Sequence, residues 1–373
     1  MIILGAMSGT STDGVDVAAL HADPSNGGLR FISHRSESFD GALRQRLLDL
    51  QQVPFISKPG EDQLGLMLAC RRDLTLAYAE SVRALMSDLG IEPQEIRVLG
   101  AHGQTLRHRP DLGFTYQMLD GALLAVQTGL DVVCDMRSKD VALGGQGAPL
   151  VPSFHQAWLA SKGFSTRSAV LNLGGFSNLT VLQDAESPVL GGDCGPANCL
   201  MDLWAKEKFG LDFDEGGSIA ASGQVDERLL ATLLTHPFFD RSWPKSTGRD
   251  DFNFNWLKAC LAQYGHAVSN QDVMATLMAM AVEVVKACLP NFVDRLFVCG
   301  GGAHNEVFVA QLALSLAPVQ VSPIEDLGLP AQAVEAAAFS WLAMQSVLRL
   351  PANCPSVTGA SRSAVLGALH TCQ

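Results

Sequence analysis

One pattern occurs twice in this 373-residue chain: an apolar strand, a turn of small residues and a second apolar strand. The first copy spans residues 1–20, with its turn at residues 5–14, and the second spans residues 169–182, with its turn at Gly174 and Gly175. Apolar runs separated by turns rich in Gly, Ser and Asp predict β-hairpins. Two such hairpins about half a chain apart predict two related lobes, each presenting its turn to a shared cleft.

The first turn is unusual because glycines, hydroxyl groups and two acids, Asp13 and Asp16, are concentrated within it or just after it. Glycine lets backbone N–H groups approach a ligand closely, and neighbouring hydroxyl groups add donors, so such a turn suits a phosphate chain. An ordinary hairpin loop is the alternative for a single turn of this kind. A further glycine-rich turn, Gly300–Gly302, follows an apolar run at residues 296–299 and favours the phosphate interpretation.

The rest of the chain alternates short apolar runs with helical patterns. This alternation after a leading hairpin predicts an α/β fold with mixed sheets. The Gly- and Pro-rich stretch at residues 141–152 predicts a crossing between lobes. Helices are expected at residues 42–50, 62–89, 119–128, 199–208, 272–288, 305–316 and 331–348.

Composition excludes several classes of function. A net charge of −12 without a basic run argues against a nucleic-acid partner. Nine scattered cysteines without zinc-site spacing predict free thiols in a reducing compartment. The sequence has neither the pattern of a signal peptide nor an apolar run of about 18 residues, so we expect a cytoplasmic protein with no membrane partner.

The common nucleotide-binding motifs are absent from the sequence. There is no P-loop string, no Gly-x-Gly-x-x-Gly opening a helix, and no protein-kinase set of His-Arg-Asp and Asp-Phe-Gly. What remains is a phosphate cradled by hairpin turns, with acids placed for a divalent cation. Asp13 and Asp16 could hold Mg²⁺ through water, or they could be structural acids of an exposed strand.

Asp193 is the candidate general base. It follows an apolar strand and two glycines, so its carboxylate is expected at a strand end, although a turn or N-cap acid is the alternative. The polar loop Lys245-Ser-Thr-Gly-Arg249 could reach a ligand or be solvated.

Candidate substrate contacts follow strand ends or lie in an Ala-rich helix: His102, Gln104, Thr105, Asp135, Arg137 and Glu335. A histidine at the carboxyl end of a buried strand lies where ligands of α/β sheets gather, although a structural role is the alternative for His102. Asp135 and Arg137 could form a substrate clamp or an internal ion pair. Glu335, as a buried acid, would need a partner.

Taken together, seven motifs make the sequence resemble the anhydro-N-acetylmuramic acid kinase family over essentially its whole length. They are Met7-Ser-Gly-Thr-Ser-Thr-Asp-Gly-Val-Asp16, His102-Gly-Gln-Thr105, Gly144-Gly-Gln-Gly-Ala-Pro-Leu150, Asn172-Leu-Gly-Gly-Phe-Ser-Asn178, Asp193-Cys-Gly-Pro196, Ser246-Thr-Gly-Arg249 and Cys299-Gly-Gly-Gly302. The resemblance implies the two-lobed actin/Hsp70/sugar-kinase fold, which is ribonuclease H-like, with an ATP cleft between the lobes, and a homodimer. Lobe I is expected at residues 1–130 plus about 350–373, and lobe II at residues 131–349.

The resemblance also implies a reaction. Water adds at the anomeric carbon of 1,6-anhydro-N-acetylmuramic acid with Asp193 as its base, and O6 receives the γ-phosphoryl group of ATP in the presence of Mg²⁺. Another sugar or carboxylate kinase of this fold is the alternative, followed by a non-catalytic ATP-binding regulator. ATP is expected to contact residues of the three turns: Ser8, Gly9, Thr10, Ser11, Thr12, Asp13, Gly14, Val15, Asp16, Gly174, Gly175, Ser177, Asn178, Gly300, Gly301 and Gly302.

Overall fold

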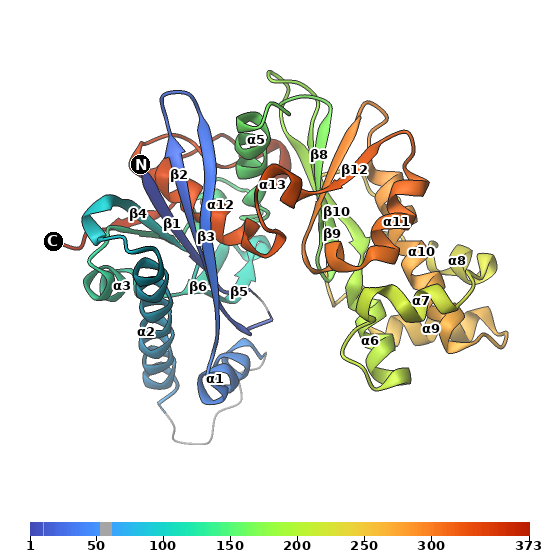
Figure 1. Ribbon diagram of the computed structural model, residues 1–373. Coiled ribbons are helices and arrows are strands. Elements are labelled where there is room, and N and C mark those ends of the chain that lie inside the picture. Colours follow the sequence, from blue (N-terminus) through green and yellow to red (C-terminus); the bar gives the residue numbers. More distant parts are fainter. Residues whose placement is uncertain (10, 53–61) are drawn as a thin grey trace. The chain divides into compact units, whose positions relative to one another are not determined.

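Two mixed β-sheets organise the chain, one in each of two units (Figure 1). The computed structural model describes residues 1–9, 11–52 and 62–373. Unit 1 comprises Met1–Lys162 and Ala333–Gln373, and unit 2 comprises Gly163–Gln332. Helices flank the sheet of each unit, which confirms the predicted α/β class.

The sheet of unit 1 has the strand order β13-β7-β4-β1-β2-β3. Strands β1, β2 and β3 form an antiparallel meander, whereas β4 and β7 run parallel to β1. A separate hairpin is formed by β5 and β6. The strands are β1 (Ile2–Met7), β2 (Gly14–Asp23), β3 (Gly28–Ser38), β4 (Ile96–Ala101), β5 (Gln104–Arg109), β6 (Phe114–Met118), β7 (Val132–Cys134) and β13 (Ala368–His370).

The sheet of unit 2 has the order β10-β9-β8-β11-β12. Here β8, β9 and β10 form the antiparallel meander, and β11 and β12 run parallel to β8. This order and these directions repeat those of β3-β2-β1-β4-β7, so the predicted repeat is confirmed, as is the ribonuclease H-like plan. The strands are β8 (Ser168–Leu173), β9 (Phe176–Leu182), β10 (Leu190–Pro196), β11 (Arg295–Cys299) and β12 (Gln320–Pro323).

Helices cover the sheet of unit 1 because its strands are apolar on both faces. Leu4 and Ala6 of β1 pack into one core cluster with Leu74 and Tyr78 of α2. The helix α12 contacts β1, β2 and β4. The helices of this unit are α1 (Gly41–Gln51), α2 (Gln63–Leu89), α3 (Gly121–Thr128), α4 (Ser138–Ala142), α5 (Val151–Ser161), α12 (Val334–Val347) and α13 (Pro355–Thr358).

The core of unit 2 is built from alternate residues of its strands and the apolar face of a long helix. Leu171 and Leu179 lie in one cluster with Met274 and Met278 of α10. The period of the methionines along α10 matches a buried helical stripe. The helices are α6 (Asn198–Phe209), α7 (Ser218–Ser222), α8 (Glu227–Leu233), α9 (Phe254–Tyr264), α10 (Asn270–Cys288) and α11 (Glu306–Ser315).

The unit boundaries differ from the predicted lobe boundaries near residues 130 and 349. The chain passes from unit 1 to unit 2 after Lys162 and returns at Ala333. The Gly- and Pro-rich stretch predicted as a crossing lies within unit 1, between α4 and α5. Packing explains the difference. The helices α5 and α12 contact each other, and α12 also contacts β1, β2 and β4, so both helices belong to unit 1.

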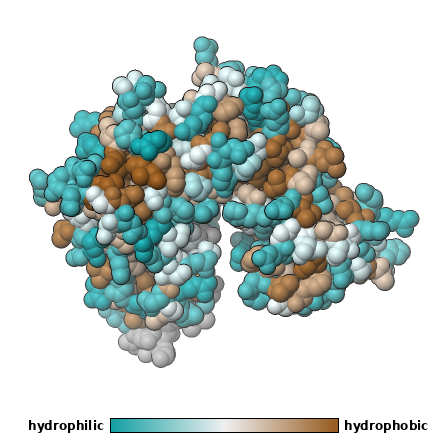
Figure 2. Space-filling model, viewed as in Figure 1, coloured by the Kyte–Doolittle hydropathy of each residue, from teal (hydrophilic) through white to brown (hydrophobic). Residues whose placement is uncertain are grey.

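Hydrophilic residues border the hydrophobic patches on the visible surface of each unit (Figure 2). None of the helices in the described part of the chain is long and apolar enough to cross a membrane. All nine cysteines are free thiols, as the sequence predicted.

Candidate active site

Parallel strands bring three polar loops of unit 1 to one sheet edge. Strands β1, β4 and β7 run in the same direction, so their carboxyl ends share an edge. The loop at residues 8–13 follows β1, His102 follows β4, and Asp135 follows β7. Ligands of α/β sheets gather at such edges. The predicted position of His102 at a strand end is therefore confirmed.

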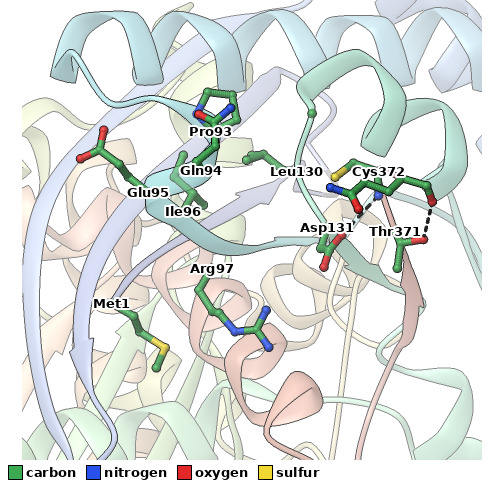
Figure 3. Close-up of a pocket in the computed structure, with 12 residues that line it drawn as sticks. Met1, Pro93, Gln94, Glu95, Ile96, Arg97, Leu130, Asp131, Thr371 and Cys372 are labelled. Atoms are coloured by element: carbon green, nitrogen blue, oxygen red, sulfur yellow. Dashed lines mark hydrogen bonds between the residues drawn. The ribbon is translucent and has the colours of Figure 1, made fainter.

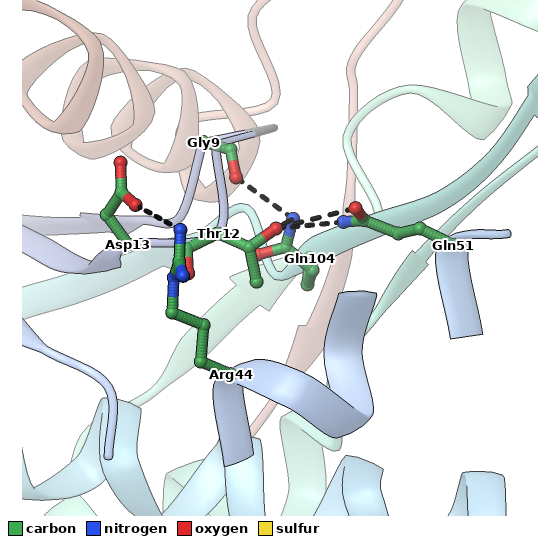
Figure 4. A network of polar contacts seen from close by, with 6 residues as sticks. All are labelled: Gly9, Thr12, Asp13, Arg44, Gln51 and Gln104. Atoms are coloured by element: carbon green, nitrogen blue, oxygen red, sulfur yellow. Dashed lines mark hydrogen bonds and ion pairs between the residues drawn. The ribbon is translucent and has the colours of Figure 1, made fainter. Parts of the chain in front are cut away.

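The loop after β1 is held by the side chain of Gln104 (Figure 4). Gln104 is fully buried, and its Nε2 donates to the carbonyl of Gly9 over 2.9 Å. Its Oε1 accepts from the hydroxyl of Ser8. Thr12 Oγ1 accepts from Gln51 Nε2 over 3.1 Å. Gln104 is predicted to contact substrate, but in the structure its side-chain amide forms hydrogen bonds that hold this loop.

Thr12 has a left-handed backbone conformation, with φ of 58°. This conformation costs a residue other than glycine about 1–2 kcal/mol, so surrounding contacts must hold it. Arg44 supplies one, because its Nε donates to the Thr12 carbonyl over 3.1 Å. Val15 is buried in β2, which begins at Gly14, whereas Ser11 is exposed. Thr10 lies outside the described residues.

The two predicted metal acids have protein partners. Asp13 is exposed and accepts from Arg44 Nη2 over 3.1 Å, and Asp16 accepts from the Ser36 hydroxyl over 2.5 Å. The pKa of Asp16 is raised, mainly because burial disfavours its charge and also because the Asp13 charge lies near. Two carboxylates that repel each other fit a hydrated Mg²⁺, which prefers few carboxylates plus phosphate oxygens. Within the described residues, no group of three or more His, Cys, Asp or Glu could hold a metal by itself.

His102, which is buried, and Arg137, which is half-buried, form a polar pair in unit 1. Arg137 Nε donates to His102 Nε2 over 3.0 Å. Because arginine can only donate, the imidazole proton must be on Nδ1, which lies 2.8 Å from the carbonyl of Gly103 and donates to it. Burial and the Arg137 charge lower the pKa of His102 to about 3. His102 is therefore neutral over the physiological range and orients Arg137.

Asp135 and Glu335 differ from their sequence-based interpretations. Asp135 is exposed and accepts from the Ser138 hydroxyl over 2.5 Å, while Arg137 Nη1 donates to the carbonyl of Gly147 over 2.9 Å. The ion pair considered for Asp135 and Arg137 is thus not formed between these two described residues. Glu335 is solvent-accessible on the first turn of α12, not buried as expected, because that turn lies at the helix end. Nearby protein atoms still displace enough water to raise its pKa, and the Arg137 charge opposes this.

In unit 2 the glycine-rich turns meet at the corresponding edge. The turn Gly174–Gly175 follows β8, and Gly300 follows the parallel strand β11. Gly300 has φ of 82°, and an added Cβ there would lie 2.2 Å from Asn172 Oδ1. The carbonyls of Gly174 and Gly175 accept hydrogen bonds from the N–H groups at the start of α6, which fixes this turn. The structure therefore brings together Gly174, Gly175, Gly300, Gly301 and Gly302.

A row of polar residues crosses the sheet of unit 2. The strand register pairs Asn172 with Asn178, and Asn178 with Asp193. Directly opposed residues share one face of a sheet, and all three residues are half-exposed. Ser177 is buried next to this row, and its hydroxyl donates to the Gly195 carbonyl over 3.2 Å. Asp193 thus lies on an accessible polar face of the sheet. It is two strands away from Asn172, which precedes the glycine-rich turn.

The electrostatic setting of Asp193 suits proton transfer. Burial raises its pKa to about 6, whereas the N–H of Thr247 and the charge of Lys245 lower it. The Thr247 N–H donates to Asp193 Oδ2 over 2.9 Å. A carboxyl group with a pKa near neutrality is ionised at pH 7 and still basic enough to accept a proton.

The pKa of Asp193 predicts a pH-dependent stability. A carboxyl pKa raised from 3.8 to about 6 favours the protonated folded state, so this contribution to stability is present below pH 3.8 and is lost as pH rises through 6. Asp193→Asn removes the titration. We expect its free energy of unfolding, relative to the wild type, to rise by roughly 2–3 kcal/mol between pH 4 and pH 8 in urea titrations. A difference that stays constant with pH would contradict the environment described for this carboxyl.

A surface cavity of about 680 Å³ lies at the opposite edge of the sheet of unit 1 (Figure 3). Its lining includes Met1, Arg97 and Asp131, which stand at the amino ends of β1, β4 and β7. Asp131 accepts from the N–H of Cys372 over 3.2 Å. Because the candidate loops follow the carboxyl ends of these strands, this cavity does not belong to the candidate site.

Several contacts of the site were not predicted. Arg44 and Gln51 come from α1 and hold the first loop, and Asn178 was assigned to ATP without its pairing to Asp193. The polar loop that begins at Lys245 was noted, and it lies against Asp193. The charged, hydroxyl and glycine residues in that loop were the sequence signal that it could be part of the site. The roles of the predicted residues toward ATP, metal and substrate stay predictions.

Comparison with known proteins gives the family. Residues 1–372 match the family described as anhydro-N-acetylmuramic acid kinase. A protein of that name from Cupriavidus pinatubonensis is 44% identical over 98% of this chain and 97% of its own length. Relatives with the same name from Paraburkholderia xenovorans and Shewanella sediminis are 44% and 41% identical, over 99% and 98% of this chain and 97% of their own lengths. The chain belongs to the anhydro-N-acetylmuramic acid kinase family.

Proposed function

We propose that this kinase converts 1,6-anhydro-N-acetylmuramic acid, ATP and water into N-acetylmuramic acid 6-phosphate and ADP. Membership of the family supports the substrate and the reaction type. The observation that carries the mechanism is the half-exposed carboxyl of Asp193, with a pKa of about 6 and a position in the polar row of unit 2. Such a product would serve the recycling of cell-wall sugars.

In the proposed step, the Asp193 carboxylate accepts a proton from water while the water oxygen bonds to the anomeric carbon. The bond between that carbon and O6 breaks, and its electron pair stays on O6. O6 then bonds to the γ-phosphorus of ATP, and the bond from phosphorus to the ADP oxygen breaks. The step balances, because one water is added, one phosphoryl group is transferred and the proton rests on Asp193.

We assign ATP binding to the three turns. Backbone N–H groups and hydroxyls of Ser8–Asp16 would contact the phosphates, and residues 174–178 and 300–302 would contact the nucleotide. Asp13 and Asp16 would hold Mg²⁺ through water, and this ion would neutralise phosphate charge. His102, Thr105, Asp135, Arg137 and Glu335 are assigned to the sugar, with Arg137 suited to a carboxylate because its guanidinium is oriented by His102. Gln104 would act through the loop that it holds.

The assembly and location follow from the same proposal. The family resemblance favours a homodimer. The nine free thiols favour a reducing compartment, and we assign the protein to the cytoplasm on that basis. The small, anionic sugar and ATP are the proposed partners.

The experiment that tests this function follows the oxygen atoms. The protein is incubated with ATP, Mg²⁺ and 1,6-anhydro-N-acetylmuramic acid in ¹⁸O-water, and the product is analysed by mass spectrometry and NMR. We expect ¹⁸O at the anomeric hydroxyl, phosphate on O6 and one ADP per product. N-acetylmuramic acid, which lacks the anhydro bridge, serves as the control acceptor.

Two outcomes would contradict the proposal. If no ADP were released with the anhydro sugar, the proposed reaction would be contradicted. Equal phosphorylation of N-acetylmuramic acid would instead indicate an ordinary sugar kinase, because no bond to the anomeric carbon is then broken.

A further inference from the structure

A five-residue segment of unit 2 binds Asp193 at three points. The Asp193 N–H donates to the carbonyl of Lys245 over 3.0 Å, and Trp243 Nε1 donates to the carbonyl of Asp193 over 3.3 Å. The N–H of Thr247 donates to the Asp193 side chain over 2.9 Å. We call residues 243–247 the strap. It fixes both the backbone and the carboxylate of the candidate base.

The strap lies directly against the strand that carries Asp193. A Cβ added to Gly192 would lie 2.7 Å from Trp243 Cδ1 and 3.1 Å from the Lys245 carbonyl oxygen. A side chain at this position would push the strap away from β10. The glycine next to the candidate base is therefore explained by this close approach.

Lys245 is held with its ammonium group inside the unit. Its Nζ donates to the carbonyls of Phe238 and Phe239 over 3.3 and 3.2 Å, and it lies 4.6 Å from the ring centroid of Phe238. The side chain is half-buried. An ammonium fixed by two carbonyls keeps its position relative to its surroundings, and its charge is less screened than that of a surface lysine.

Four titratable groups interact around the strap: Lys245, Asp193, Cys194 and Cys288. The charge of Lys245 acts on Asp193 and on the neighbouring thiols of Cys194 and Cys288, which are hydrogen-bonded to each other. Lys245 is the cation among these groups. Its charge stabilises the ionised form of Asp193, whereas burial of Asp193 favours the protonated form.

We propose that Lys245 is a positioning residue for the reaction: its ammonium, held by the carbonyls of Phe238 and Phe239, keeps the Asp193 carboxylate ionised and therefore able to accept a proton. This inference rests on the proposed role of Asp193 as the base. It adds a role for a residue that does not touch the reacting atoms.

The direction of the pH effect follows from the sign of the charge. The Lys245 ammonium lowers the pKa of Asp193, so its removal raises that pKa above about 6. A larger fraction of Asp193 is then protonated at a given pH, and the acid limb of the kcat profile moves to higher pH. His102, with a pKa of about 3, stays neutral and does not titrate in this range.

The test variant is Lys245→Gln, which keeps a donor for the phenylalanine carbonyls and removes the charge. We expect the acid limb of kcat to move to higher pH, while kcat above the limb stays within about threefold of the wild type and the KM for ATP is unchanged. Lys245→Arg keeps the charge and is expected to restore the wild-type limb. The control is Lys258→Gln, because Lys258 is exposed on α9, 5.2 Å from the Phe254 ring centroid.

Each outcome decides the inference. An unmoved acid limb in Lys245→Gln overturns it, and so does a lowered kcat plateau without a shift, since that is what a purely structural lysine would give. If Lys245→Gln does not fold, Lys245→Met, which removes the charge but keeps an unbranched side chain of similar length, decides: an acid limb above that of the wild type supports the inference and an unmoved limb overturns it. Normal turnover by Asp193→Asn would end the proposed role of Asp193 as the base, whereas an inactive Asp193→Asn with a wild-type limb in Lys245→Gln would end only this inference.

Discussion

Asp193→Asn is expected to lower kcat by roughly 1,000-fold or more while ATP binds with wild-type affinity, because the amide is nearly isosteric but cannot accept the proton of the attacking water. The carboxylate is the proton acceptor in the proposed step, and the amide oxygen retains only the contact from Thr247. The measurement pairs steady-state release of ADP with calorimetric titration of an ATP analogue. A fall in ATP affinity that accounts for the loss of rate would place Asp193 in nucleotide binding instead.

Asp184→Asn is the matched control for this variant. Asp184 lies in the loop between β9 and β10, where its carboxylate accepts from the Ser187 hydroxyl over 2.7 Å. The substitution makes the same chemical change in the same unit, and an asparagine supports the same turn. We expect wild-type kcat. Comparable losses in the two variants would show that the effect comes from unit stability, and Asp193 would lose its role as base.

Gly300→Ala is expected to destabilise unit 2 by about 3 kcal/mol, because both the backbone conformation and the space at this position require glycine. The φ of 82° lies in the left-handed region. An added Cβ would stand 2.2 Å from Asn172 Oδ1 and 2.9 Å from the carbonyl carbon of Leu173, so the end of β8 would have to move. Urea unfolding followed by tryptophan fluorescence measures the loss.

The adjacent glycine provides the control for this prediction. A Cβ on Gly301 meets no atom within 4 Å. We expect Gly301→Ala to change the free energy of unfolding by less than about 0.5 kcal/mol. Similar destabilisation by both substitutions would mean that the loop after β11 is not packed against Asn172 and Leu173 as described.

Local signals in the sequence predicted the elements of both hairpins and the end of the longest helix. Apolar runs on either side of small-residue turns became β1, β2, β8 and β9. Gly90 ends α2 in a left-handed conformation with φ of 63°, as the position of a glycine after a helical pattern predicts. The carboxyl-end position of His102 also followed from a short buried run. These features depend on neighbours in sequence, which is why they could be predicted.

Contacts between distant segments could not be predicted in this way. The polar row of Asn172, Asn178 and Asp193 depends on strand register, and the strap depends on a loop about fifty residues further along the chain. Gln104 was assigned to substrate because it follows a strand, yet its partners are in the loop after β1. Periodicity and composition describe local stretches of sequence, so they do not indicate which distant segments will pair.

The stretch at residues 141–152 shows a different reason why the unit boundaries differ from the expected lobe boundaries. Glycines and prolines at residues 141–152 have the composition of a linker. In the structure, Asp140 of α4 is fully buried and accepts from the Gly147 N–H over 2.8 Å and from Asn353 Nδ2 over 2.7 Å. The stretch is therefore tied to the carboxyl-terminal part of unit 1. Turn-forming residues serve tight packing as well as they serve a linker.

The repeated strand order has an evolutionary consequence. Two copies of one strand order within a chain are the pattern that duplication of an ancestral half leaves behind. The last strand pairs of the two leading hairpins are Met7 with Asp16 and Leu173 with Ser177, so eight residues close the first hairpin and three close the second. Asp13 and the hydroxyl groups of Ser8, Ser11 and Thr12 lie in the longer connection, whereas Asp16 is the strand residue that pairs with Met7. The two halves would then have diverged in the length of this turn while the sheet beneath it kept its plan.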